Sequence, residues 1–140
     1  MAATGAAPTV MLVGLVVPAT PADALDALRT ELRALGGRTA LVAVTGASNL
    51  TGEVWPVQEI ARRAHEHGAR VVLDAAQLAA HRAIDIAAWD VDYVAFSGHK
   101  VYGPMGIGVL YGRHELLASL PPYQVGGGTV KGVSFAAPVE

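Results

Sequence analysis

Residues 93–111 read YVAFSGHKVYGPMGIGVLY, and this stretch decides the fold. Tyr93 to Phe96 is a short apolar run that runs directly into Ser97, as expected for a buried strand, and Gly108 to Tyr111 is a second such run. The link from Ser97 to Ile107 is short for a parallel crossover, which usually needs a dozen residues or more. We therefore expect the strand 108–111 to lie antiparallel to the strand 93–96.

Upstream of this stretch, apolar runs alternate with amphipathic helical patterns, which indicates an α/β fold with a mostly parallel sheet. Thr20-Pro21 is a start signal for a helix, and Gly36-Gly37 is a stop signal. The continuous apolar run 41–44 is typical of a strand buried on both faces. The further strands are expected at 13–17 and 71–73, and the further helices from Pro56 to Gly68 and near 114–120.

Length and composition predict a globular chain with one domain. Of the 140 residues, 52% are hydrophobic and 16% are charged, which argues against disorder. The net charge is -2 and the basic residues are scattered, so we expect no nucleic-acid partner and no polybasic membrane surface. The apolar run 10–19 is about half a membrane span, and no basic residue precedes it, which favours a buried strand over a signal peptide.

Polar residues gather where the predicted strands end, which is where ligands sit in such sheets. Lys100 follows the strand 93–96 beside an apolar, glycine-rich loop, where desolvation would favour a nucleophilic amine. The glycines would let the backbone approach a flat ligand closely. Ser97 and His99 are able to donate hydrogen bonds to a phosphate. The alternative is an ordinary surface-loop lysine.

Other candidates lie after the two preceding strands. Asp74 is able to pair with a protonated heterocyclic nitrogen, although a carboxylate at this position also caps turns. Gln77, about one helical turn later, is able to donate to a ring hydroxyl. Asn49 either contacts a cofactor or substrate or forms a common turn. His81 either lines a pocket or is a packed histidine. No histidine spacing predicts a metal site.

Taken together, these segments resemble one family. SNLTG at 48–52, DAAQ at 74–77, DYVAFSGHK at 92–100 and YGPMGIGVLYGR at 102–113 are similar to the class V aminotransferases, and most of all to the SufS-like cysteine desulfurases and selenocysteine lyases. The resemblance implies the large domain of a fold-type I, pyridoxal-phosphate-dependent transferase, aspartate aminotransferase-like, with a three-layer sandwich. It implies a Schiff base on Lys100, with Asn49, Asp74, Gln77, Ser97 and His99 binding the cofactor.

The resemblance also implies biological context. The substrate would be a small amino acid, cysteine or selenocysteine, and the complete enzyme a cytoplasmic homodimer with no membrane partner. We expect a loose end at 1–12, a partial cofactor-binding domain at 13–128 and an irregular tail at 129–140. The 140 residues contain no cysteine to carry sulfur, and other parts of the family's site lie outside them, so we expect this chain alone to be inactive. The alternative is a non-catalytic remnant or companion subunit.

Overall fold

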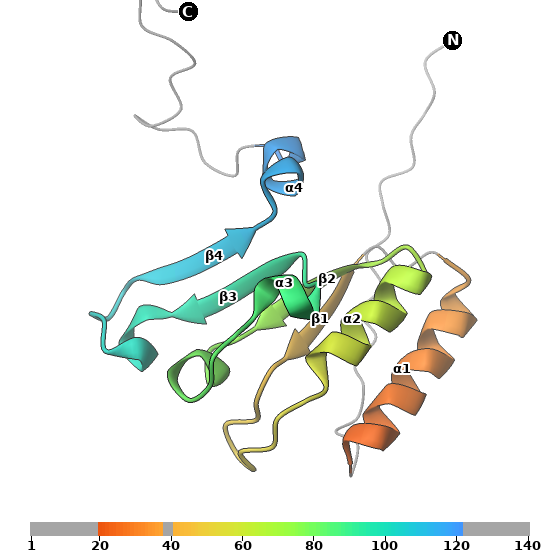
Figure 1. The fold of residues 1–140 in the computed structure, drawn as a ribbon, viewed down its shortest axis with the longest axis horizontal. Helices are drawn as coiled ribbons and strands as arrows, with labels where there is room; N and C mark the ends of the chain where they lie inside the picture. Colours follow the sequence, from red (N-terminus) through yellow and green to blue (C-terminus); the bar gives the residue numbers. More distant parts are fainter. Residues whose placement is uncertain (1–19, 38–40, 122–140) are drawn as a thin grey trace, which may run out of the picture.

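The computed structural model describes residues 20–37 and 41–121. The expected strand 13–17, the loose end 1–12 and the tail 129–140 lie outside the described residues. The described residues form a sheet of four strands, and helices pack beside it (Figure 1). The elements in chain order are α1 (Pro21–Leu35), β1 (Leu41–Thr45), α2 (Val57–Glu66), β2 (Arg70–Asp74), η1 (Leu78–Ala80), α3 (Ile86–Trp89), β3 (Tyr93–Ser97), η2 (Gly98–Val101), β4 (Gly108–Gly112) and α4 (His114–Ser119).

The sheet has the order β1-β2-β3-β4. β1 pairs with β2 and β2 with β3 in parallel, whereas β3 and β4 are antiparallel, with Ser97 opposite Gly108. The short link between these last two strands made this reversal predictable, and the prediction is confirmed. As a result the carboxyl ends of β1, β2 and β3 lie along the same edge of the sheet.

Helix α1 begins and ends where its sequence signals predicted. The Thr20 hydroxyl accepts a hydrogen bond from the Asp23 backbone N–H at 3.2 Å. At the other end, Gly36 has a φ of 58°, in the left-handed region that favours glycine, and its N–H bonds the carbonyls of Leu32 and Arg33. These caps satisfy backbone groups that the helix itself leaves unpaired.

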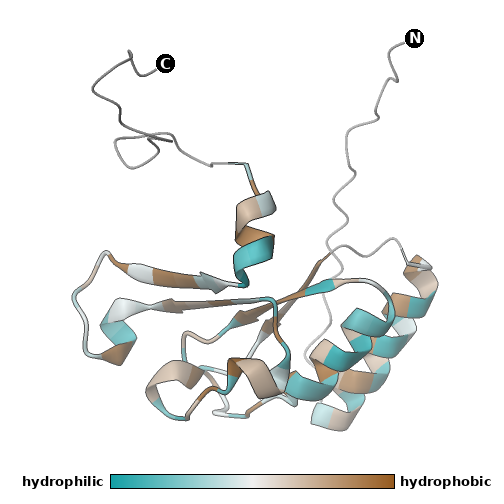
Figure 2. Ribbon diagram, turned by 45° about the horizontal axis from the view of Figure 1, so that its top comes forward, coloured by the Kyte–Doolittle hydropathy of each residue, from teal (hydrophilic) through white to brown (hydrophobic). Residues whose placement is uncertain are grey.

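The core lies between the sheet and helices α1, α2 and α3, which share one side of it, whereas α4 lies on the other side beyond the end of β4 (Figure 2). Val71, Leu73 and Val94 project from the sheet into this core and are almost completely buried. Ala61 and Ala64 of α2, both fully buried, allow the helix to approach β2 closely. Burial of each large apolar side chain contributes about 1.5–3 kcal/mol to stability.

The prediction that the strand at 41–44 is buried on both faces is wrong. β1 alternates exposed and half-buried residues, and Leu41 is 52% exposed. Within the described residues β1 pairs only with β2. The helices cover the face that carries Val42 and Val44 and leave the other face open. The unbroken apolar run thus predicted the strand correctly, but it did not predict which of the two faces of the strand is buried.

No helix within residues 20–37 and 41–121 has both the length and the apolar character that crossing a membrane requires.

Candidate functional site

The open face of the sheet carries two of the predicted site residues. Asp74 ends β2 and lies opposite Ala95 of β3, and Ser97 ends β3 two residues later. Because side chains alternate along a strand, Asp74 and Ser97 point to the same face. That face is the one away from α2, since the intervening Leu73 is buried against the helices. The structure therefore brings a carboxylate and a hydroxyl to one edge of neighbouring parallel strands.

Asp74 is held in place by the turn that follows it. Its Oδ1 accepts the backbone N–H of Ala76 at 2.9 Å, and its backbone carbonyl accepts the N–H of Gly46 at 2.8 Å. The turn-capping role considered for this aspartate is therefore present. Oδ2 has no hydrogen-bond partner within the described residues, so the exposed carboxylate keeps one oxygen for a ligand.

Lys100 and His99 lie on η2, immediately after β3. The loop is closed by hydrogen bonds from the Gly98 N–H to the Ile107 carbonyl, 3.0 Å, and from the Gly103 N–H to the Gly98 carbonyl, 2.9 Å. His99 is exposed and Lys100 is half-buried. Neither side chain has a hydrogen bond or an ion pair within the described part of the chain, so both are available to a ligand.

Two glycines of this segment, Gly98 and Gly103, allow close contacts within it. A Cβ on Gly98 would lie 2.6 Å from the Ile107 side chain, and one on Gly103 would lie 2.9 Å from the Gly98 carbonyl oxygen. Both contacts are shorter than side chains tolerate. Close packing of the chain itself therefore requires glycine at these two positions.

Asn49 and Gln77 line a cleft of about 360 Å³. Asn49 lies in a turn in which the Ser48 hydroxyl accepts the N–H groups of Leu50 and Thr51, both at 3.2 Å. Four residues from the segment after β2 also contribute to the lining. The lining residues are Ala47, Ser48, Asn49, Gly52, Val54, Gln77, Leu78, His81 and Arg82.

The predicted site residues thus form two groups. Asn49, Gln77 and His81 all line the cleft. Asp74 and Ser97 end the adjoining strands, with His99 and Lys100 on η2. None of these four lines the cleft. Segments η1 and η2 contact each other, so the two groups are neighbours along the carboxyl edge of the sheet.

Comparison with known proteins decides the family. The model of the family described as aminotransferase class-V matches residues 13–139. The chain belongs to the class-V aminotransferase family. A cysteine desulfurase of Dickeya dadantii is 51% identical over 121 residues, which are 86% of this chain and 29% of that protein. One from Synechococcus elongatus is 50% identical over 101 residues, 72% of this chain and 16% of that protein.

Solved structures of class-V aminotransferase relatives agree. The crystal structure of the cysteine desulfurase CsdA from Escherichia coli superposes with a TM-score of 0.74 at 42% identity, over 84% of this chain and 29% of that one. The apo cysteine desulfurase of Thermococcus onnurineus gives 0.69 at 39% identity, over 79% and 27%. The chain therefore spans under a third of the length of these relatives.

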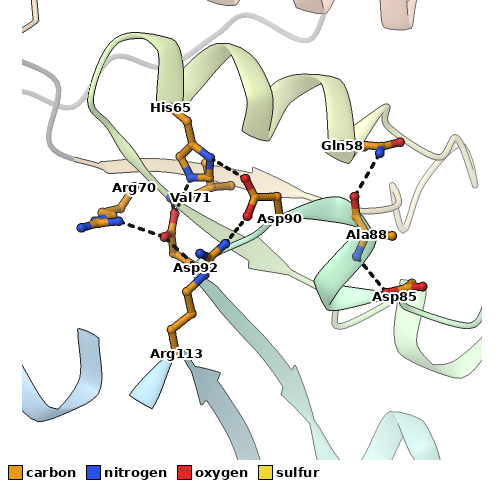
Figure 3. Close-up of polar contacts among 9 residues, drawn as sticks. All are labelled: Gln58, His65, Arg70, Val71, Asp85, Ala88, Asp90, Asp92 and Arg113. Atoms are coloured by element: carbon orange, nitrogen blue, oxygen red, sulfur yellow. Dashed lines mark hydrogen bonds and ion pairs between the residues drawn. The ribbon is translucent and has the colours of Figure 1, made fainter. Parts of the chain in front are cut away.

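A polar cluster that the sequence patterns did not predict lies at the amino end of β3 in this class-V aminotransferase chain (Figure 3). Asp92 is completely buried. Its Oδ2 accepts the Val71 backbone N–H at 2.8 Å and lies 2.8 Å from His65 Nε2, while its Oδ1 lies 3.3 Å from Arg70 Nη1 and 3.8 Å from Arg113 Nε. The only available signal was a charged residue within an apolar run.

Charge complementarity holds this cluster together. Burial by itself would raise the pKa of Asp92, but hydrogen bonds from His65 and the Val71 N–H outweigh it and lower the pKa. A hydrogen bond from Arg113 lowers the pKa of Asp90, which also lies 3.2 Å from His65 Nδ1. The cluster joins α2, β2 and the ends of β3 and β4, and so ties these elements together.

Proposed function

We propose that this chain supplies the cofactor-binding part of a pyridoxal-phosphate-dependent enzyme that cleaves the carbon–sulfur bond of cysteine or the carbon–selenium bond of selenocysteine. The family membership and the relatives named cysteine desulfurases support the reaction class. The observation that carries the proposal is the placement of a carboxylate at the end of β2, a hydroxyl at the end of β3 and a lysine on η2 directly after it, each with an atom that has no partner among the described residues. As the resemblance implies, we extend the proposal to a cytoplasmic homodimer.

The residues present fit the chemistry of this cofactor. Lys100 offers a primary amine to an aldehyde. Asp74 offers a protonated ring nitrogen its Oδ2, which has no hydrogen-bond partner within residues 20–37 and 41–121. Ser97 and His99 offer donors to a phosphate, and Asn49 and Gln77 offer amides to a ring hydroxyl or a substrate. When bound, pyridoxal phosphate supplies an electron sink next to the bond that breaks.

The protein's own groups would then orient the reaction and move protons. The Asp74 carboxylate would keep a proton on the ring nitrogen, because a carboxylate fixed by the Ala76 N–H stabilises a neighbouring positive charge. The Lys100 amine would hold the cofactor through its aldehyde group, and the same amine would take a proton from the substrate carbon and return one to it. The closed η2 loop would fix where that amine points, and such positioning accounts for much of an enzyme's rate.

Turnover by the complete protein tests this proposal. Purified protein with pyridoxal phosphate, L-cysteine and a reductant should release alanine and sulfide in equal amounts. Lys100→Ala should abolish release, whereas Lys131→Ala, at the other lysine of these 140 residues, should not. Sulfide release that survives in Lys100→Ala would overturn the assignment of the lysine, and decarboxylated or transaminated products would overturn the reaction class.

A further inference from the structure

Ile107 covers the buried glycine at which the lysine-bearing turn η2 begins. A Cβ built on Gly98 would lie 2.6 Å from Ile107 Cγ1 and 3.0 Å from its Cδ1. The Ile107 side chain therefore occupies the space that any other residue at position 98 would need for its own side chain. The Ile107 carbonyl also accepts the Gly98 N–H at 3.0 Å. The backbone and the side chain of one residue thus hold Gly98 together.

The end of the turn fixes the carbonyl of the same glycine. The Gly98 carbonyl accepts the N–H of Gly103 at 2.9 Å and also the N–H of Tyr102, which ends η2. Tyr102 has a φ of 64°, in the left-handed region that residues other than glycine rarely adopt. Such a backbone persists only where the surrounding structure constrains it. Lys100 lies between Gly98 and Tyr102, so the position of Gly98 determines where the lysine side chain starts.

Stability of the core does not account for an isoleucine at this position. Ile107 is 55% exposed, so more than half of its surface stays in water. Hydrophobic stabilisation is roughly proportional to the apolar area removed from water, so Ile107 contributes much less of it than a core residue does. Its Cγ1 and Cδ1 atoms nevertheless lie against Gly98. The contact is therefore local to the turn that carries Lys100.

We propose that Ile107 is a positioning residue for Lys100, which holds η2 so that the lysine amine meets the aldehyde group of pyridoxal phosphate. This role rests on the proposed function, since that function gives Lys100 its part in the reaction. Ile107 acts through Gly98, which precedes His99 and Lys100 in the turn. Reacting groups must be held close together and aligned. Loss of the contact should therefore weaken attachment of the cofactor to Lys100 more than it weakens the fold.

Labelling of the complete, cofactor-free protein with pyridoxal phosphate tests the proposal. The Lys100 amine and the aldehyde form a C=N bond with release of water, and borohydride reduces this bond, so that mass spectrometry measures the labelled fraction. Ile107→Ala removes Cγ1 and Cδ1, whereas Ile107→Val keeps a carbon at the γ position that lies nearest to Gly98. Leu120→Ala is the matched control. Leu120 has an isomeric side chain, is 52% exposed and follows α4, beyond the end of β4 that is farther from η2.

We expect Ile107→Ala to raise the concentration of pyridoxal phosphate that half-labels Lys100 by about tenfold, since a misplacement of about 1 Å costs up to about a hundredfold in rate. Ile107→Val and Leu120→Ala should stay within about twofold of the native chain, because both keep a side chain against Gly98. Acetic anhydride needs an accessible amine but no alignment. It should therefore acetylate Lys100 at least as fast in Ile107→Ala as in the native chain.

A second variant tests the same contact from the other side. Gly98→Ala places a methyl group where the Ile107 side chain lies. It should therefore reduce labelling of Lys100 less in the Ile107→Ala background than in the native background. An equal reduction in both backgrounds would overturn the proposal, as would equal half-labelling concentrations for Ile107→Ala and Leu120→Ala. Equal losses of pyridoxyl and acetyl labelling would also overturn it, and so would an Ile107→Ala chain that circular dichroism shows to be unfolded.

This proposal and the proposed function fail in different ways. A native protein that binds pyridoxal phosphate without a label on Lys100 would remove the proposed function, and the positioning role with it. Labelling of Lys100 that Ile107→Ala leaves unchanged would remove the positioning role alone. The measured quantity is the labelled fraction of one lysine, so neither outcome depends on turnover.

Discussion

Asp92→Asn replaces the buried carboxylate of the polar cluster with a group of the same shape and no charge. One carboxylate oxygen now serves the Val71 N–H and His65, and the other faces Arg70 and Arg113 (Figure 3). Asparagine has one acceptor oxygen and one NH2 group. If the amide oxygen stays toward the Val71 N–H, the NH2 group faces the guanidinium groups of Arg70 and Arg113. In the reverse orientation the NH2 group faces the Val71 N–H. In both cases donors face donors.

The free energy of unfolding should therefore fall by about 2–4 kcal/mol. Loss of the charge weakens the contact with His65, since bonds to charged groups contribute about 1.5–3 kcal/mol and neutral ones about 0.5–1.5. A buried NH2 group without an acceptor costs about 1–3 kcal/mol more. Arg70 adds little, because its side chain is 53% exposed and its contact is screened by solvent.

Urea unfolding of the full chain, followed by circular dichroism, measures this loss, with Asp85→Asn as the control. Asp85 accepts the Ala88 N–H at 2.9 Å at the start of α3, and asparagine caps helices about as well as aspartate does. Asp85→Asn should therefore change the unfolding free energy by less than about 0.5 kcal/mol. A loss for Asp92→Asn no larger than that of the control would refute the reasoning.

The same comparison should depend on pH in one direction. The pKa of Asp92 is lower in the folded chain than in the unfolded chain. The contribution of its charge to the free energy of unfolding is therefore complete above the unfolded pKa of about 3.9, and it is lost as the pH falls through the pKa of the folded chain. The difference in stability between the native chain and Asp92→Asn should hold down to about pH 4 and shrink below it. A difference that persists unchanged below that range would contradict the lowered pKa.

Three further predictions test other parts of the structure. Hydrogen bonds from two arginines of α2 lower the pKa of Glu59 to about 2. A carbon-detected NMR titration of the Glu59 carboxyl should therefore have its midpoint at that pH. A midpoint near 4.5 would contradict the ion pairs. Asp74→Asn should leave the free energy of unfolding almost unchanged, because asparagine still accepts the Ala76 N–H. It should lower turnover of the complete enzyme at least about tenfold. Unchanged turnover would remove Asp74 from the mechanism. Gly103→Ala should lower stability by about 1–3 kcal/mol through contact with the Gly98 carbonyl, and a melting temperature equal to that of the native chain would contradict this close packing.

Much of the fold was predictable because its signals are local. The cap at Thr20 and the glycine at position 36 mark the two ends of α1. The short link before Gly108 indicated that β4 is antiparallel to β3. The exposure of β1 was not predictable in the same way. It depends on which elements pack on each face, and the apolar pattern at 41–44 does not contain that information.

Prediction of the candidate site was likewise uneven. The positions of Asp74 and Ser97 at strand ends followed from the alternation of strands and helices, and the structure shows these positions. The cluster around Asp92 joins residues 21 to 27 positions apart, and spacing along one helix or strand does not reveal such a contact. The role of Gly98 also depends on a contact across the loop, with Ile107.

Chemical labelling of Lys100 is the measurement on which the proposed function depends most. The complete protein is incubated with pyridoxal phosphate, reduced with sodium borohydride, digested and mapped by mass spectrometry. Within these 140 residues the only other lysine is Lys131, so each outcome is unambiguous there. We expect a pyridoxyl group on Lys100 and none in Lys100→Ala. A label on Lys131 in place of Lys100, or an unlabelled Lys100 in protein that has bound the cofactor, would contradict the proposed function.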